Sequence, residues 1–219
     1  MFSELTPLLH DGKKLTRHLS CLFIFALVLG LISYFFLDQD LAVFFRKEEN
    51  MSLWILAREV TNIGLGQHYF IFIFLFLGFL YYRGQRTWLK AWAWNSLAAL
   101  SLAGLFLLLM KYLFGRQRPH ISLDSSHGTF EFFNHHWDYQ SFPSGHAQVL
   151  FTVATLVAVL DPKRKYLWYL LALLFSFTRV ITYSHFTSDV IAGAFIGVAG
   201  SLFALYLMNR YSRFPLFKK

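Results

Sequence analysis

Long apolar stretches separated by short charged segments constrain the fold of this chain more than any other feature. The 219 residues are 56% hydrophobic and 20% aromatic, whereas ordinary soluble domains are about 45–50% apolar. Several stretches approach the ~20 residues that a helix needs to cross a bilayer, and they span residues 19–37, 69–82, 91–110, 147–160, 166–177 and 190–208. The pattern predicts an all-α integral membrane bundle of six transmembrane helices, in one domain over residues 1–219.

Residues 38–68, between the first two stretches, are mixed in character. Apolar side chains alternate with charged ones at helical spacing, which is typical of helices that lie in the membrane interface. We predict an interfacial amphipathic helical segment here. It would either cap the bundle or act as a lid that guides a lipid headgroup.

The basic residues are distributed unevenly along the chain. The net charge is +8, from 20 basic and 12 acidic residues. The termini and the loops after the second and fourth stretches carry about +10, and the remaining segments about −2. Positive charge in short loops marks the cytoplasmic side. We therefore predict cytoplasmic termini, and because orientation accounts for the excess charge, we expect no nucleic-acid partner.

Cys21 is the only cysteine and lies inside the first apolar stretch. It can form no internal disulfide and no cysteine cluster for a metal. Lys13, Lys14 and Arg17 precede that stretch as in a signal peptide, but no small-residue cleavage site follows. We expect a retained helix.

Small residues recur in the last apolar stretch, at Gly193, Gly197 and Gly200. Such a surface lets transmembrane helices pack closely. We assign this surface a packing role and no chemistry.

Three short polar segments interrupt the apolar sequence, and the first follows the third stretch. Lys111 ends that stretch, and Arg118 and Pro119 follow it. Ammonium and guanidinium groups are the usual holders of phosphate oxygens. The alternative is that Lys111 and Arg116 only extend toward the membrane surface from a helix end.

The second polar segment, Pro143, Ser144, Gly145 and His146, directly precedes the fourth stretch. A helix start gathers partial positive charge and free N–H groups, which favours an anion. Ser144 can donate its hydroxyl, Gly145 allows close backbone approach, and His146 can exchange a proton.

The third polar segment contains Arg179, His185 and Asp189. On a helix, Asp189 would lie one turn from His185 and could accept a hydrogen bond from one imidazole nitrogen. The other nitrogen would then be free for nucleophilic attack. Alternatively, Asp189 only caps the last helix and His185 is an interfacial residue.

Residues 120–142 form a long polar and aromatic loop that raises the question of a metal site. Histidines and acids are frequent in it, but none of its histidines shows the i, i+4 spacing of a zinc helix motif. We therefore expect no metal here. Interleaved aromatic residues are typical of a loop that dips into lipid headgroups, and we expect the loop to select the substrate.

Taken in order, the three polar segments resemble the signature of the type 2 phosphatidic acid phosphatase superfamily, which includes lipid phosphatases, acid phosphatases and vanadium haloperoxidases. Its pattern is Lys-x6-Arg-Pro, then Pro-Ser-Gly-His, then Ser-Arg-x5-His-x3-Asp. Thr178 replaces the usual Ser and keeps a hydroxyl. The resemblance covers roughly residues 60–208, and the six-helix architecture is similar to the membrane lipid phosphatase branch.

The resemblance implies a role for each residue. His185 would attack phosphorus to form a phosphohistidine, with Asp189 orienting it, and His146 would protonate the leaving oxygen and then activate water. The phosphoryl oxygens would be held by Lys111, Arg118, Ser144, Gly145 and Arg179. No metal and no cofactor is implied.

The sequence thus predicts a bacterial inner-membrane lipid phosphate phosphatase whose active site faces the periplasm. The alternatives are a phosphotransferase that passes the phosphoryl group to another lipid, a vanadate-dependent halide oxidase, which is disfavoured because those relatives are soluble and larger, and a non-catalytic scaffold or transporter. The candidate substrates are undecaprenyl pyrophosphate, phosphatidylglycerophosphate, phosphatidic acid and lipid A.

Overall fold

The computed structural model describes residues 9–47, 50–84, 87–122 and 128–216. These residues are helical throughout, apart from connecting loops and one isolated antiparallel bridge between Arg116 and Phe130. The elements are α2 (Gly12–Phe36), α3 (Asp38–Arg46), α4 (Met51–Val60), the 3₁₀ turn η2 (Thr61–Gly64), α5 (Gly66–Tyr82), α6 (Thr87–Phe114), the 3₁₀ turn η3 (Trp137–Tyr139), α7 (Gly145–Leu160), the 3₁₀ turn η4 (Pro162–Arg164), α8 (Lys165–Ile181) and α9 (Thr187–Tyr211).

All six apolar stretches form helices, so the predicted all-α fold is confirmed. Four segments of the described chain are long and apolar enough to cross a membrane: Gly12–Phe36, Met51–Tyr82, Thr87–Phe114 and Thr187–Tyr211. Helices α7 and α8 have only 16 and 17 residues. The count of six transmembrane helices therefore stays a prediction, as does the interfacial position of α3 and α4.

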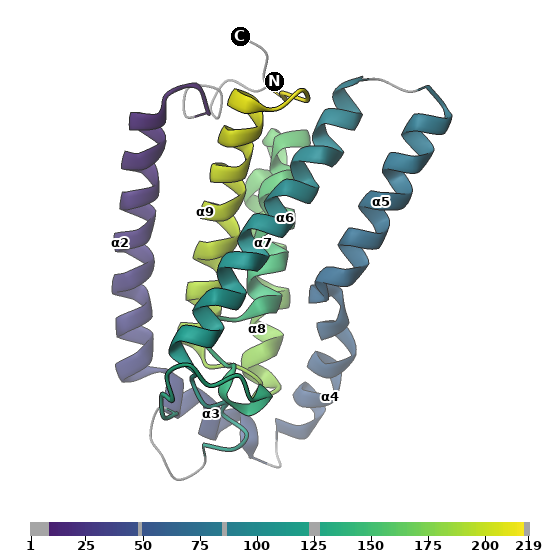
Figure 1. The fold of residues 1–219 in the computed structure, drawn as a ribbon. Coiled ribbons are helices and arrows are strands. Elements are labelled where there is room, and N and C mark those ends of the chain that lie inside the picture. Colours follow the sequence, from purple (N-terminus) through teal and green to yellow (C-terminus); the bar gives the residue numbers. More distant parts are fainter. Residues whose placement is uncertain (1–8, 48–49, 85–86, 123–127, 217–219) are drawn as a thin grey trace.

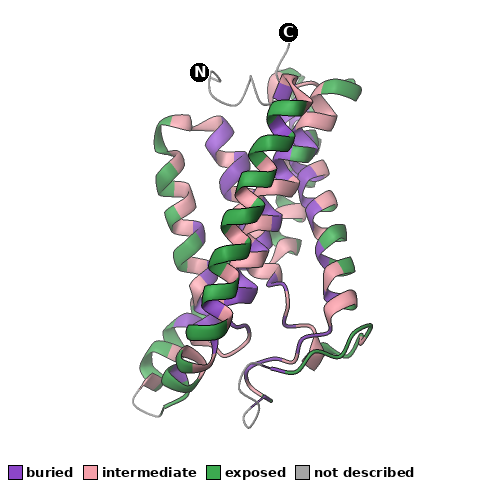
Figure 2. Ribbon diagram, turned by 90° about the vertical axis from the view of Figure 1, so that its left-hand side faces the viewer, coloured by how far each residue is buried: buried purple, intermediate pink, exposed green. Residues whose placement is uncertain are grey.

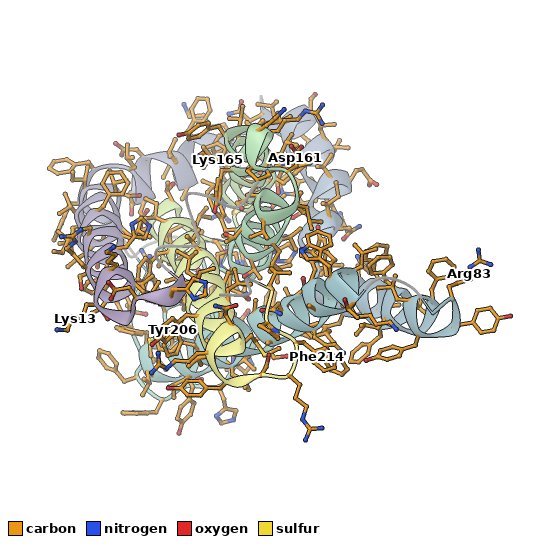
Figure 3. All side chains as sticks on the ribbon, turned by 90° about the horizontal axis from the view of Figure 1, so that it is seen from above. Lys13, Arg83, Asp161, Lys165, Tyr206 and Phe214 are labelled. Atoms are coloured by element: carbon orange, nitrogen blue, oxygen red, sulfur yellow. The ribbon has the colours of Figure 1, made fainter. Side chains whose placement is uncertain are left out.

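The start of α2 and the end of α9 lie at one end of the bundle, whereas α3 and η3 lie at the other (Figure 1). We call these the terminal end and the site end. Looking onto the terminal end, Lys13, Arg83 and Lys165 lie around its edge (Figure 3). The basic segments predicted to lie on one side of the membrane are thus at the same end of the bundle.

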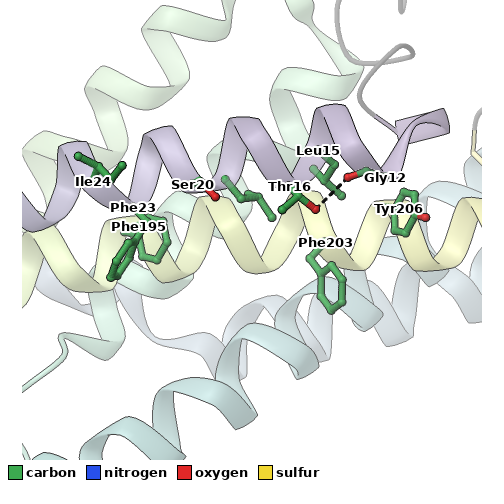
Figure 4. Close-up of a pocket in the computed structure, with 10 residues that line it drawn as sticks. Gly12, Leu15, Thr16, Ser20, Phe23, Ile24, Phe195, Phe203 and Tyr206 are labelled. Atoms are coloured by element: carbon green, nitrogen blue, oxygen red, sulfur yellow. Dashed lines mark hydrogen bonds between the residues drawn. The ribbon is translucent and has the colours of Figure 1, made fainter.

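Helix α9 lies at the centre of the bundle, packed against α7, α6 and α2. Buried residues are frequent along α7 and α9, whereas α2 and α5 are exposed along most of their length. Figure 2 shows burial concentrated in the inner helices. In α2 the buried residues are only Leu15 and Ser33. A pocket remains between α2 and α9 near the terminal end, with Gly12 and Tyr206 among the residues that line it (Figure 4).

Close backbone approach explains the small residues of α9. A Cβ atom added to Gly193 would lie 2.3 Å from the carbonyl oxygen of Ser144, and one added to Gly197 would lie 2.4 Å from that of Gln148. One added to Gly200 would lie 2.8 Å from Ala103 Cβ. The predicted packing surface is confirmed, and it brings α9 close to the first turns of α7 and to α6.

Candidate active site

The first and third polar segments meet at the site end through Arg118. Its Nη1 donates to the carbonyl oxygen of Ser184 at 2.9 Å, and its Nε donates to that of Trp137 at 3.1 Å. Lys111 Nζ and Arg118 Nη2 both donate to the carbonyl oxygen of Gln140. The end of α6 is thereby tied to the chain before α7 and to the turn before α9.

The second and third polar segments meet where α7 and α9 begin. The backbone N–H of Ser144 donates to the carbonyl oxygen of Asp189 at 2.9 Å. The close contact at Gly193 lies on the same side of α9. These contacts bring all three polar segments of the sequence together at the site end.

His185 is buried in the turn between α8 and α9, and its Nδ1 lies 2.7 Å from the carbonyl oxygen of Ser141. Since a carbonyl oxygen can only accept, Nδ1 carries the proton and Nε2 keeps its lone pair. We expected Asp189 to be this acceptor, but its Oδ2 lies 3.8 Å from Nδ1. The carboxylate therefore acts on the imidazole by charge, and a main-chain oxygen fixes the tautomer.

Burial keeps His185 uncharged. It lowers the pKa of the imidazole well below its usual value, and the nearby charges of Arg118 and Lys111 lower it further, although Asp189 opposes the shift. The structure thus presents a neutral imidazole with a free Nε2, which is the state that a nucleophilic histidine needs.

Asp189 is fully buried and saturated with hydrogen bonds. Its Oδ1 accepts from Arg116 Nη1 at 2.6 Å, and its Oδ2 accepts from Ser141 Oγ at 2.6 Å and from the backbone N–H of Phe186 at 2.9 Å. The last contact caps the start of α9, so the capping role weighed for Asp189 coexists with its place beside His185.

Arg116 is a site residue that the sequence analysis did not identify. It does not extend toward the membrane surface, the alternative stated for it above, since its side chain is only 1% exposed. Its Nη2 lies 2.8 Å from Asp38 Oδ2, while Nη1 holds Asp189, and its guanidinium lies 4.1 Å from the centre of the Phe186 ring. Burial alone would lower the pKa of Arg116, but the two carboxylates outweigh it and raise that pKa.

Three further cations surround the two histidines: Lys111, Arg118 and Arg179. Their charges all act on His146. Burial lowers the pKa of Arg118 to about 10, which leaves it charged at neutral pH. Such a cluster of fixed cations suits an anion with several oxygens.

Two polar atoms at the site are buried and have no hydrogen-bond partner within the described part of the chain. They are Ser144 Oγ and Arg179 Nε. Buried polar atoms are normally paired, so these two donors are free for a ligand. Gly145 makes no tight contact, since an added Cβ would meet only Leu107, at 3.5 Å.

The turn η2 forms a wall of the site that the sequence did not reveal. Thr61 Oγ1 accepts from Arg179 Nη1 at 2.9 Å. A Cβ added to Gly64 would lie 2.6 Å from His146 Cδ2. These contacts position Arg179 and His146, but Thr61 and Gly64 belong to no recognisable pattern.

The long loop before α7 carries exposed aromatic side chains, among them Phe132, Phe133 and Trp137, and the Trp137 ring lies 4.2 Å from the guanidinium of Arg118. Asp138 lies 3.5 Å from His120 Nε2 and 3.5 Å from His136 Nδ1. Asp124 and His127 fall outside the described residues, and within those residues no group of three histidine, cysteine or acidic side chains is placed to hold a metal ion. The loop's role in substrate selection stays a prediction.

Comparison with known proteins shows the family of this chain. The profile of the PAP2 superfamily matches residues 92–213, more than half of the chain. The lipid A 1-phosphatase of Rhizobium etli is 31% identical over 133 residues, which cover 61% of this chain and 55% of that protein. The enzyme of the same name from Rhizobium johnstonii is 31% identical over 57% of this chain and 50% of its own length. This chain thus spans about half the length of these two relatives.

A shorter match links the chain to the bacitracin transport permease protein BcrC of Bacillus licheniformis, 33% identical over 33% of this chain and 36% of that protein. Among solved structures, Aquifex aeolicus LpxE superimposes with a TM-score of 0.56 at 24% identity, covering 77% of this chain and 94% of that one. This likeness shows a shared fold. With more than half of its length matching the profile, this chain belongs to the PAP2 superfamily.

Proposed function

We propose that this protein is a metal-independent lipid phosphate phosphatase that works through a phosphohistidine on His185. The observation that carries the proposal is the state of that imidazole: it is buried and neutral, and its Nδ1 proton is committed to the Ser141 carbonyl. Nε2 is therefore the only nucleophilic nitrogen. The unpaired donors of Ser144 and Arg179 lie at the same site.

The chemistry follows from these positions in two steps. His185 Nε2 forms a bond to phosphorus while the bond from phosphorus to the lipid oxygen breaks. His146, which takes up a proton once the negative phosphoryl group offsets the three cations around it, gives that oxygen its proton. Neutral His146 then takes a proton from water, whose oxygen attacks phosphorus and releases His185 and inorganic phosphate. Lys111, Arg118 and Arg179, with Ser144 Oγ and the Gly145 amide, stabilise the charge on the equatorial oxygens.

We place this reaction on the periplasmic face of a bacterial inner membrane, within one domain over residues 1–219. The support is the separation of charge: the basic loops lie at the terminal end and the active site lies at the other. Because basic loops stay in the cytoplasm, the site would face the periplasm.

This orientation can be tested with single cysteines in a Cys21→Ser background. His135→Cys should react with an impermeant maleimide in intact spheroplasts, and Lys163→Cys should react only after the membrane is permeabilised. Labelling in the reverse order would overturn the periplasmic placement and leave the chemistry untouched.

Lipid A is our first candidate substrate, because the two similar Rhizobium proteins are named lipid A 1-phosphatases. Undecaprenyl pyrophosphate, phosphatidylglycerophosphate and phosphatidic acid share the required phosphoryl group and lipid anchor. The exposed aromatic loop near the site would contact the headgroup and so help to distinguish them.

The test is phosphate release by the purified protein in detergent from each of the four lipids, with EDTA present. We expect one lipid to be clearly preferred and the His185→Ala variant to be inactive on it. Release from none of them, or a strict need for added Mg²⁺, would overturn the proposal. Transfer of labelled phosphate to an added acceptor lipid would instead identify a phosphotransferase.

A further inference from the structure

The buried ion pairs of Arg116 extend beyond the residues that contact the phosphoryl group. Asp38, at the start of α3, accepts from Arg116 Nη2 at 2.8 Å and is only 1% exposed. Its Oδ1 also accepts from Ser33 Oγ at 3.1 Å and from the backbone N–H of Ser188 at 2.9 Å, and its Oδ2 accepts from Ser188 Oγ. Asp38 thus links the corner between α2 and α3 to the first turn of α9.

Stability alone does not explain a buried charged network of this kind. Taking carboxylates and a guanidinium out of water costs about as much as their mutual attraction returns, and well-packed apolar residues often serve as well or better. The network lies directly behind the nucleophile, since Asp189 Oδ2 is 3.8 Å from His185 Nδ1. Its location therefore suggests a role in the reaction.

Arg116 holds both groups that act on His185 Nδ1. Its side chain binds Asp189, and its own carbonyl oxygen accepts from the backbone N–H of Ser141 at 2.9 Å. The carbonyl of Ser141 in turn accepts from His185. The position of Arg116 consequently fixes the orientation of the imidazole and the place of the carboxylate beside it.

We propose that Asp38 is a positioning residue for the reaction of His185, acting through Arg116 and Asp189. Its carboxylate shares the guanidinium with Asp189, so that part of the negative charge of Asp189 remains effective at the imidazole. That charge matters during attack, because the imidazole becomes cationic when Nε2 bonds to phosphorus. Asp38 touches neither the phosphoryl group nor the imidazole.

Replacing Asp38 by asparagine should keep the fold. The side chain has nearly the same shape, and Arg116 stays paired with Asp189, so no buried charge loses its partner. The guanidinium would then be neutralised by Asp189 more completely, and the field at His185 would be weaker in the transition state. This inference rests on the proposed phosphatase function.

The experiment compares Asp38→Asn with Asp40→Asn, its matched control on the same helix, because Asp40 is exposed. We expect Asp38→Asn to lower kcat about tenfold with KM within twofold of wild type, and Asp40→Asn to change neither. The inhibition constant for vanadate, which mimics the five-coordinate phosphoryl transition state, should rise by a similar factor.

The vanadate measurement separates positioning from folding. A merely structural role would reduce the amount of active enzyme and leave the vanadate constant of the remainder unchanged, and that outcome overturns the proposal. So does a kcat within twofold of wild type. If wild type itself releases no phosphate, the proposed function fails instead, and a positive control lipid in the wild-type assay distinguishes the two failures.

A second variant covers the case in which Asp38→Asn yields no folded protein. Ser188→Ala removes one hydroxyl that bonds both Asp38 and Arg116 and keeps every charge. We expect kcat to fall and the vanadate constant to rise, each about threefold. If both stay at wild-type values in folded Ser188→Ala, the proposal is wrong.

Discussion

The two ends of the bundle use charge in opposite ways. At the site end Asp38, Lys111, Arg116, Arg118 and Asp189 are all buried, each held by other polar groups. At the terminal end the described cations are mostly exposed, as for Lys13, Lys14, Arg83, Lys163 and Arg164. Water solvates one set and the protein itself solvates the other. Only the second arrangement fixes each charge in space, which is what catalysis by charge requires.

The largest expected difference between the ends concerns two histidines. His185→Ala should reduce phosphate release by about 10³-fold or more, because it removes the nucleophile. His18→Ala, at an exposed position near the terminal end, should leave the rate unchanged. Phosphate release by equal amounts of folded protein measures both. More than a few per cent of wild-type activity in His185→Ala would contradict the role of the nucleophile.

Loss of an arginine should destabilise the protein more at the site end than at the terminal end. Arg116→Gln leaves Asp38 and Asp189 without the cation that bridges them, which should destabilise the protein by about 3–5 kcal/mol. Arg164 is 71% exposed and 3.4 Å from Asp161, and Arg164→Gln should cost less than about 1 kcal/mol. Thermal unfolding in detergent gives both values. Equal losses would mean that the buried network contributes no more than a surface pair.

Glycine substitutions test the same contrast through packing. A Cβ at Gly193 would meet the main chain of Ser144, which cannot move without moving the start of α7. We expect Gly193→Ala to cost about 1–3 kcal/mol and to slow turnover about tenfold. A Cβ at Gly12 would meet only the end of the Tyr206 side chain, at 3.0 Å. Gly12→Ala should therefore leave turnover unchanged, and a matching loss there would show that the effect is not specific to the site.

Lowering the pH should destabilise the folded protein through His185 at the site end. We expect this to be the smallest of the four effects. The pKa of His185 is lowered in the folded protein, so the unfolded chain binds the proton more readily. The stabilisation that comes from this shift is fully present above about pH 6.5. It is lost as the pH falls below that value, by up to about 1.4 kcal/mol per pH unit. Unfolding temperatures of wild type, His185→Gln and His18→Gln between pH 7.5 and 5.5 measure it. Wild type and His18→Gln should lose more than His185→Gln, and parallel losses in all three would contradict the shift.

The candidate site residues that could be identified from the sequence are those of the three polar segments, which occur in a set order along the chain. Lys111, Arg118, His146 and His185 stood out because charged or titratable residues are rare in apolar stretches. Asp38 did not, because it lies 78 positions from Arg116 and only folding brings them together. Thr61 and Gly64 were missed for the same reason.

The helices themselves were predictable from the apolar stretches, but their arrangement was not. Helices α2 and α9 have the same length and similar apolar character, yet 6% of the most apolar part of α2 is buried, against 44% for α9. Glycine at the contact points decides which of them can reach the backbone of α7. Small residues therefore predicted the position of α9 better than its apolarity did.

The hydrogen-bond acceptor for His185 Nδ1 is the main-chain carbonyl of Ser141, which side-chain substitution cannot remove. Every amino acid carries a carbonyl oxygen, so no codon change at position 141 removes this partner of the imidazole. A scan of all substitutions would report only the loss of the Ser141 hydroxyl and would underrate the position. Replacing the peptide bond after Ser141 with an ester, through an α-hydroxy acid introduced at position 142, would weaken that carbonyl as an acceptor while leaving both neighbouring side chains in place.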